Sequence, residues 1–175
     1  IELEPVTAQR AFQDCSSLGS VTLPPALESI GRNSFQYSGL RSIAMPDTVV
    51  SMGVAAFASA RGLEQAVLSK GLTAIPGYAF TQSGLKKIEI PDGVVEVREI
   101  AFTACNNLAS VTFGKSLAKI GTQAFYNCPS LAEMYFAGDA PAIEGAVYLA
   151  NKLYYKAGTS GWTTPTWNGK ATYEY

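Results

Sequence analysis

Hydrophobic and polar positions follow one another along this chain in a pattern that recurs at a nearly constant interval. Phenylalanine marks the period, at positions Phe12, Phe35, Phe57, Phe80, Phe102 and Phe125. A leucine follows each phenylalanine by five or six residues, and an aliphatic residue precedes the next phenylalanine by five. Such a short period with regularly placed leucine is typical of a solenoid, in which stacked repeats share one core. We therefore expect a stacked ladder of five phenylalanine side chains, Phe35, Phe57, Phe80, Phe102 and Phe125.

Each repeat predicts a strand followed by a turn and a short helical segment. Apolar and polar residues alternate at 18–23 and 85–90, as expected for half-buried strands. Proline then ends several of these strands, for example Pro91. A second short apolar pair, such as Leu117 and Ile120, comes before the next phenylalanine. Because polar residues lead into the Ala-Phe step, we interpret that step as a short helix or 3₁₀ turn.

Two repeats are one residue shorter than the others, and a third departs in composition. The short copies, "FQYSGL" and "FTQSGL", carry Gly39 and Gly84 just before the leucine. Glycine adopts positive φ readily, so we expect it to allow the shorter turn there. In the repeat of Phe57, Ala60 and Ser69 stand where other repeats have cysteine and proline. We expect this change to weaken the turn of that repeat but not its strand.

The repeated phrase resembles the BspA-like leucine-rich repeat family. The segments "IGTQAFYNCPSLAEMYF" (120–136) and "VREIAFTACNNLASVTF" (97–113) carry the family pattern, and the resemblance covers residues 7 to about 143. It implies an α/β repeat fold, a right-handed leucine-rich-repeat solenoid with a parallel sheet on its concave side and short helices or 3₁₀ turns on its convex side. It also implies an exported or cell-surface bacterial or protist protein whose repeats serve adhesion or ligand binding.

The repeat pattern ends before the chain does. We expect the solenoid to occupy residues 1–153, and residues 154–175, rich in tyrosine and tryptophan, to form a C-terminal cap over its last apolar rung. The alternative for this tail is an aromatic platform that binds sugars. Because Ile1 is not a natural start, we also expect the chain to be a fragment of a longer protein, with further rungs or another domain upstream.

Composition excludes several kinds of chemistry. The chain has no histidine, which removes serine–histidine and cysteine–histidine catalysis and most zinc sites. Its net charge of −1 does not fit a nucleic-acid-binding surface, and no apolar run is long enough to span a bilayer. The aspartates fall in turns without a dense calcium loop, and Glu89 and Glu133 have no predicted cleft around them. We therefore predict no enzymatic activity, no cofactor, no metal site and no membrane insertion by this fragment.

The three cysteines share one position of the repeat, three residues after the phenylalanine. Cys15, Cys105 and Cys128 are predicted to be buried free thiols that fill a small hole in the core. A disulfide between Cys105 and Cys128 on adjacent rungs is the alternative, although equivalent side chains on stacked rungs point in the same direction.

The outward positions of the predicted strands are mostly small and weakly polar, which suits a flat contact with a large partner better than a buried small molecule. The candidate partner-binding residues on this concave surface are Thr22, Gln65, Lys87, Glu89, Thr112, Glu133 and Tyr135. We predict a monomeric adhesion or binding module that recognises a protein or glycan at a cell or host surface. Two alternatives stay open: a passive spacer or stalk, and a carbohydrate-binding accessory domain of a larger surface enzyme.

Overall fold

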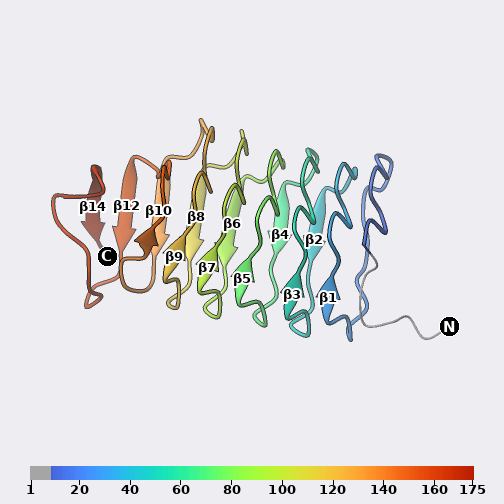
Figure 1. Cartoon of the computed structure of the whole chain (residues 1–175), viewed down its shortest axis with the longest axis horizontal. Coiled ribbons are helices and arrows are strands. Elements are labelled where there is room, and N and C mark those ends of the chain that lie inside the picture. The colour runs from blue at the N-terminus through green and yellow to red at the C-terminus, as the bar shows by residue number, and fades with distance from the viewer. Residues whose placement is uncertain (1–8) are drawn as a thin grey trace.

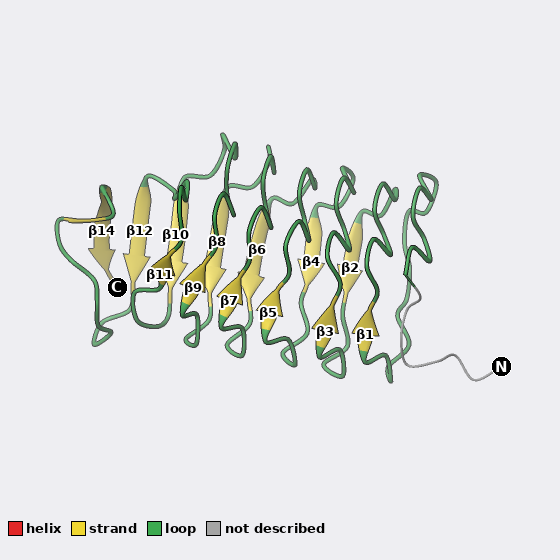
Figure 2. Cartoon of the chain, in the orientation of Figure 1, coloured by secondary structure: helices red, strands yellow, loops and turns green. Residues whose placement is uncertain are grey.

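The computed structural model describes residues 9–175, and the start of the predicted solenoid, residues 1–8, lies outside the described residues. The chain winds into a β-solenoid whose rungs stack along one long axis (Figure 1). Each regular rung has three segments, which are a turn segment around the phenylalanine, a longer strand and a two-residue strand. Equivalent segments of successive rungs lie side by side, so that the solenoid has two layers of strands and one column of turns (Figure 2).

The longer strands form the first layer, which we call the long-strand layer. Its strands are β2 (Ser42–Ala44), β4 (Gln65–Val67), β6 (Lys87–Ile90), β8 (Ser110–Phe113), β10 (Glu133–Phe136), β12 (Lys152–Tyr155) and β14 (Lys170–Glu174). β6, β8, β10, β12 and β14 form one parallel sheet in that order. β13 (Thr166–Trp167) pairs with β14 as a short antiparallel strand at the edge of this sheet. β2 and β4 pair separately. The predicted strand at 18–23 is wrong, because that segment of the first rung contains no strand.

The second layer, the short-strand layer, was not predicted as strands. It consists of β1 (Ser29–Ile30), β3 (Ser51–Met52), β5 (Ala74–Ile75), β7 (Glu96–Val97), β9 (Lys119–Ile120) and β11 (Ala142–Ile143). All pairings in this layer are parallel. β1 pairs with β3, and β5, β7, β9 and β11 form a separate sheet in that order. Two residues are too few to show alternation, so the sequence marks these strands only by a recurring buried aliphatic residue such as Ile30 or Ile120.

The predicted short helices or 3₁₀ turns are not confirmed, because residues 9–175 contain neither an α-helix nor a 3₁₀ helix. Every second amide of the turn segment donates to the next rung instead of to its own: the Phe35 amide reaches the Ala56 carbonyl at 2.8 Å, and the Phe80 amide reaches Ala101 at 2.8 Å. The amides between them close tight turns, as from Gln36 to Asn33 at 3.1 Å. An α-helix would need all of these amides for bonds within the rung. Stacking therefore replaces the helix with a hydrogen-bonded column of turns.

These turns place non-glycine residues in the left-handed region. The residue two before and the residue two after each phenylalanine have φ between 54° and 61°. These residues are Arg10, Asp14, Asn33, Tyr37, Ala55, Ser59, Tyr78, Gln82, Ile100, Ala104, Gln123 and Asn127. Asparagine tolerates this conformation, whereas a β-branched residue such as Ile100 does so only under strain.

The predicted phenylalanine ladder is confirmed. Consecutive rings from Phe12 to Phe125 stack with centroids 5.1–5.3 Å apart and interplanar angles of 2–8°. The rings from Phe35 onward are at most 1% exposed. The small residue before each phenylalanine is buried as well, for example Ala56 and Ala79. A second pair, Phe113 and Phe136, stacks inside the long-strand layer with centroids 4.7 Å apart.

Gly39 and Gly84 are required for a different reason from the one predicted, because neither has a positive φ. A Cβ atom at Gly84 would lie 2.2 Å from the Arg61 carbonyl oxygen, and one at Gly39 would lie 2.0 Å from the Ser16 carbonyl oxygen. At both positions the backbone of the short rung lies against the preceding rung, where a side chain has no room.

The rung of Phe57 interrupts both layers. β4 has no ladder with β6, and β3 has none with β5, although the phenylalanine ladder continues through this rung. Its turn is supported by the buried Ser69 hydroxyl, which donates to the Val49 carbonyl at 2.6 Å and accepts from the Gly71 amide at 3.0 Å. The expectation of a weakened turn is therefore wrong, because the turn is well bonded, whereas the strand is kept: β4 pairs with β2 and lacks a ladder only toward β6.

Candidate binding surface

The predicted contact residues collect on the outward side of the long-strand layer, which we call the long-strand face. Gln65 lies on β4, Lys87 and Glu89 on β6, and Thr112 on β8, and all four are exposed. Glu133 and Tyr135 lie half-buried on β10. Thr22 is also exposed but belongs to the first rung, which has no strand at this position. Six of the seven predicted residues therefore lie on the long-strand face, and five of them share one continuous sheet.

The parallel register arranges these residues in two rows across the strands. One row runs from Glu89 through Thr112 to Tyr135. The other row runs from Lys87 through Ser110 to Glu133. Neighbouring strands are about 4.8 Å apart, so each row forms a continuous strip of side chains. Gln65 is separated from these rows by the break between β4 and β6.

The strip extends beyond the predicted residues into a row of tyrosines. Tyr154 on β12 stacks on Tyr135 with ring centroids 4.7 Å apart and an interplanar angle of 10°. Tyr173 on β14 stacks on Tyr154 with centroids 5.3 Å apart. Tyr175 meets Tyr135 edge-on with centroids 6.1 Å apart. We call Tyr135, Tyr154 and Tyr173 the tyrosine row.

Tyr154 and Tyr173 were missed because residues 154–175 were treated as a cap outside the repeat. The signal was present in the sequence, since Tyr135, Tyr154 and Tyr173 are evenly spaced. Their interval is shorter than the one between successive phenylalanines, so a search at the phenylalanine period does not find it. Lys152, which lies beside Glu133 in the register, was missed for the same reason.

A hydrogen bond fixes the inner end of the tyrosine row. The Tyr135 hydroxyl donates to Glu133 Oε2 at 2.8 Å. This bond, followed by partial burial and the negative charge of Glu133, raises the pKa of Tyr135 above its usual value. The phenol therefore stays protonated at neutral pH, and the ring is held in place on the sheet face.

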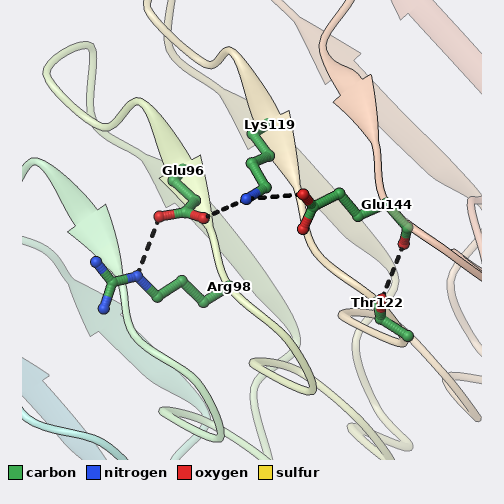
Figure 3. A network of polar contacts seen from close by, with 5 residues as sticks. All are labelled: Glu96, Arg98, Lys119, Thr122 and Glu144. Carbon is green, nitrogen blue, oxygen red and sulfur yellow. Dashed lines mark hydrogen bonds and ion pairs between the residues drawn. The ribbon is translucent and has the colours of Figure 1, made fainter.

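The two strand layers differ in how their charges are satisfied. On the short-strand layer, Glu96 on β7 pairs with Arg98 at 3.0 Å and with Lys119 at 3.1 Å, and Lys119 also pairs with Glu144 at 2.9 Å (Figure 3). The hydrogen bonds from Arg98 and Lys119 lower the pKa of Glu96, whereas the bonds to Glu144 and then Glu96 raise the pKa of Lys119. These charges satisfy one another across three rungs.

The long-strand face keeps charges that no partner neutralises. Lys87, Glu89 and Lys152 make no ion pair with any residue of the described chain, 9–175. Exposed charges of both signs beside an aromatic row can orient an incoming partner, because complementary charge acts mainly on register and association rate. The face therefore combines an aromatic contact area with free charges.

The two tryptophans form a separate cluster at the C-terminal end. Trp162 stacks on Tyr155 with centroids 5.4 Å apart, lies 4.8 Å from Phe136, and donates from Nε1 to the Gly138 carbonyl at 3.2 Å. Trp167 lies 4.8 Å from Trp162. Both indoles are half-buried and pack against the hydrophobic core.

The two carboxylates considered for catalysis, Glu89 and Glu133, do not lie side by side. Glu89 and Glu133 lie on strands separated by β8, and they stand in different rows of the register. Within residues 9–175, no group of three or more cysteine or carboxylate side chains could hold a metal ion. Asp47 and Asp92 instead accept backbone amides of the next rung, from Lys70 and Lys115, each at 3.1 Å.

The cysteines are free, as predicted, but only Cys105 is buried. Cys128 is half-buried and Cys15 is exposed, so the prediction of three buried thiols is wrong for these two. The Cys105 thiol donates to the Phe80 carbonyl at 3.1 Å, and Cys128 donates to the Phe102 carbonyl at 3.0 Å. The Cys105 and Cys128 thiols therefore both bond the backbone of the preceding rung.

The repeat and the solenoid agree with a known family model. The BspA type leucine rich repeat region matches residues 6–105 and 73–155, with six copies of the repeat. The chain belongs to the BspA-type leucine-rich repeat family. No curated protein sequence matches the chain significantly.

Two solved structures of bacterial repeat proteins are similar to this BspA-type chain. A leucine-rich repeat protein from Bacteroides ovatus is 25% identical with a TM-score of 0.64, over 82% of this chain and 45% of that protein. A leucine rich cell surface protein from Faecalibacterium prausnitzii is 32% identical with a TM-score of 0.65, over 67% of this chain and 31% of that protein. The chain therefore spans less than half the length of either protein. None of its described residues forms a helix that could cross a membrane.

Proposed function

We propose that this chain is a non-catalytic, surface-exposed adhesion or binding module that recognises a macromolecular partner through the long-strand face. The proposed contact residues are Lys87, Glu89, Thr112, Glu133 and Tyr135, joined by Lys152, Tyr154 and Tyr173, with Gln65 and Thr22 farther along the same side. The module acts as a monomer and needs no cofactor.

The tyrosine row is the observation that carries this proposal. Tyr173 is 45% exposed and continues a stack that starts at the half-buried Tyr135. Tyrosine is enriched in protein interfaces because its ring supplies contact area while its hydroxyl forms hydrogen bonds. A row of such rings beside unpaired charges has the composition of a contact surface rather than of a passive wall.

The packing of the rings favours a protein partner over a sugar that stacks on an aromatic ring. Tyr154 has Tyr135 on one side at 4.7 Å and Tyr173 on the other at 5.3 Å, so both faces of its ring are in contact with other rings. The row therefore presents ring edges and hydroxyl groups to the partner. The indoles of Trp162 and Trp167 pack against each other and against Phe136, which does not favour them as a sugar platform.

The extracellular or cell-surface location is proposed from the family and from one relative. BspA-type repeats occur in this chain, and the F. prausnitzii cell surface protein is 32% identical to it. A rigid stack of rungs that presents one exposed face suits contact with a host or neighbouring cell. We place the partner, a protein in the first instance, on such a surface.

We further propose that residues 154–175 close the C-terminal end of the solenoid. Trp162 and Trp167 pack against Phe136, which stacks on Phe113 inside the long-strand layer. β13 ends the sheet as a two-residue antiparallel strand, and short edge strands limit edge-to-edge association. Removing these residues would expose the aromatic core of the last rungs.

The binding proposal is tested with an array of immobilised extracellular-matrix proteins, epithelial-surface proteins and glycans. The purified chain is compared with Tyr154→Ser and with the charge reversal Lys87→Glu with Glu89→Lys. Lys70→Gln is the matched control, because Lys70 is exposed and lies outside the long-strand face. We expect a protein ligand whose binding is weakened about tenfold or more by Tyr154→Ser and is unchanged by the control.

The pattern of loss distinguishes the alternatives. Binding that survives both long-strand variants would place the contact elsewhere and reject the proposed face. An array on which no molecule binds would favour the spacer or stalk. A glycan ligand that is lost only in Trp162 or Trp167 variants would favour the carbohydrate-binding accessory domain.

A further inference from the structure

A polar hollow lies where the turn column meets the long-strand layer, away from the tyrosine row. Its volume is about 300 Å³, at the lower end of the range of small-molecule sites. The residues around it come from four consecutive rungs and are Arg61, Gln82, Ser83, Ala104, Asn106, Asn107 and Asn127. Apart from Ala104, all of these side chains are polar, so the hollow suits a hydrophilic ligand.

The hollow lies beside the one-residue deletion in the repeat of Phe80. The rungs of Phe57 and Phe102 place Arg61 and Asn106 four residues after the phenylalanine, whereas the rung between them has Gly84 there. Gly84 has no side chain and lies against the Arg61 backbone, where a Cβ atom would approach the carbonyl oxygen to 2.2 Å. A notch one rung wide is therefore left between two walls that carry long polar side chains.

Most side chains around the notch have groups available to a ligand, whereas the buried Ser83 hydroxyl is hydrogen-bonded to Cys105 Sγ at 3.4 Å. Within the described part of the chain, Arg61 has no ion-pair partner, and the side chains of Asn106, Asn107 and Asn127 make no hydrogen bond. Gln82 uses its oxygen to accept from the Ser59 hydroxyl at 3.2 Å, which leaves its amide nitrogen available. No carboxylate lines the hollow, so Arg61 gives it a net positive charge.

We propose that this notch binds an acidic sugar, such as a uronic acid residue. The Arg61 guanidinium can hold a carboxylate through two parallel hydrogen bonds. Each asparagine amide presents a donor and an acceptor, which match neighbouring sugar hydroxyls that also donate and accept. A phosphate or sulfate ion would leave the asparagine oxygens facing an anion, so the lining favours a ligand that carries hydroxyls as well as a carboxylate. No aromatic ring lines the hollow, so binding rests on hydrogen bonds rather than ring stacking.

The test is a titration of the isotope-labelled chain followed by amide shifts in NMR spectra, with sodium glucuronate as the probe. Glucose tests the need for the carboxylate, and sodium acetate tests the need for the hydroxyls. We expect glucuronate to bind with a Kd about tenfold or more below that of either comparator, and to shift the side-chain amides of Asn106, Asn107 and Asn127.

Two variants and one control make the test specific. Arg61→Gln is expected to reduce glucuronate binding to the level of glucose, and Asn107→Ala to weaken it several-fold, with unchanged melting temperatures. Arg41→Gln removes an exposed arginine outside the notch and is expected to bind as the wild type does. The proposal is overturned if glucuronate does not bind, if glucose or acetate binds equally well, or if Arg61→Gln binds glucuronate normally. Because these residues lie off the tyrosine row, none of these outcomes bears on the binding proposed for the long-strand face.

Discussion

Two aromatic stacks run along this solenoid, and they differ in what surrounds them. The phenylalanine ladder is buried, with centroids 5.1–5.3 Å apart and rings from Phe35 to Phe125 at most 1% exposed. The tyrosine row has nearly the same spacing, 4.7 and 5.3 Å, but lies on an outer face with Tyr173 45% exposed. The distance between successive rungs therefore suits stacking of aromatic residues at equivalent positions. A buried stack stabilises the fold, whereas an exposed stack is available to a partner.

The largest effect is expected from shortening a ring in the middle of the ladder. Phe80 is fully buried between Phe57 and Phe102, so Phe80→Ala leaves a cavity bounded by two rings that cannot move together. We expect a loss of about 3–5 kcal/mol in the free energy of unfolding, measured by urea denaturation. Phe12→Ala is the control, because Phe12 is only half-buried and stacks on one neighbour. An equal loss at both positions would show that the ladder does not act as a continuous core.

The next effect concerns the close approach of rungs at the short repeats. Gly84→Ala places a Cβ atom against the Arg61 backbone, which must shift to accommodate it. We expect a cost of about 1–3 kcal/mol, the usual range for overpacking, measured by thermal unfolding. Gly19→Ala is the matched control, since nothing lies within 4 Å of the added atom. A Gly84→Ala chain as stable as this control would contradict the role assigned to the deletion.

The sequence predicts the parts of the fold that recur at the interval between successive phenylalanines. The ladder, the longer strands and the outward position of residues such as Lys87 and Thr112 follow from that period, because equivalent side chains of stacked rungs must align. The outward direction of a strand residue follows from alternation alone. The sequence alone therefore suffices to place six of the seven candidate contact residues on the long-strand face.

Other features depend on contacts between rungs, which no single repeat displays. The turn column replaces the predicted helices because amides such as that of Phe35 bond the next rung, and residues as different as Asn33 and Ile100 share its positive φ. Glycine, asparagine and aspartate favour this conformation, but only three of the twelve positions carry one of them, Asp14, Asn33 and Asn127. The tyrosine row was missed because the last rungs are shorter than the others, so Tyr154 and Tyr173 no longer follow the phenylalanine period.

The exposed stack should contribute far less to stability than the buried one. Tyr154 is half-buried and contacts rings on both sides, so Tyr154→Ser loses ring stacking but leaves no internal cavity. We expect a loss of about 1 kcal/mol or less in the free energy of unfolding, measured by urea denaturation as for Phe80→Ala. A loss as large as that of Phe80→Ala would mean that the tyrosine row is structural and would remove the main support for the binding face.

The smallest effect is expected from the charge network on the short-strand layer, and it should depend on pH. The hydrogen bonds from Arg98 and Lys119 lower the pKa of Glu96 below its ordinary value of 4.5. A carboxylate whose pKa is lower in the folded chain adds stability above its unfolded pKa, and this contribution disappears as pH falls through the folded value. We therefore expect Glu96→Gln to lower the melting temperature slightly at neutral pH and to have no effect well below pH 4.5. Glu28→Gln is the control, because Glu28 is exposed and makes no ion pair within residues 9–175, and we expect it to leave the melting temperature unchanged. A difference between wild type and Glu96→Gln that persists unchanged in acid would show that Glu96 acts through packing rather than through its charge.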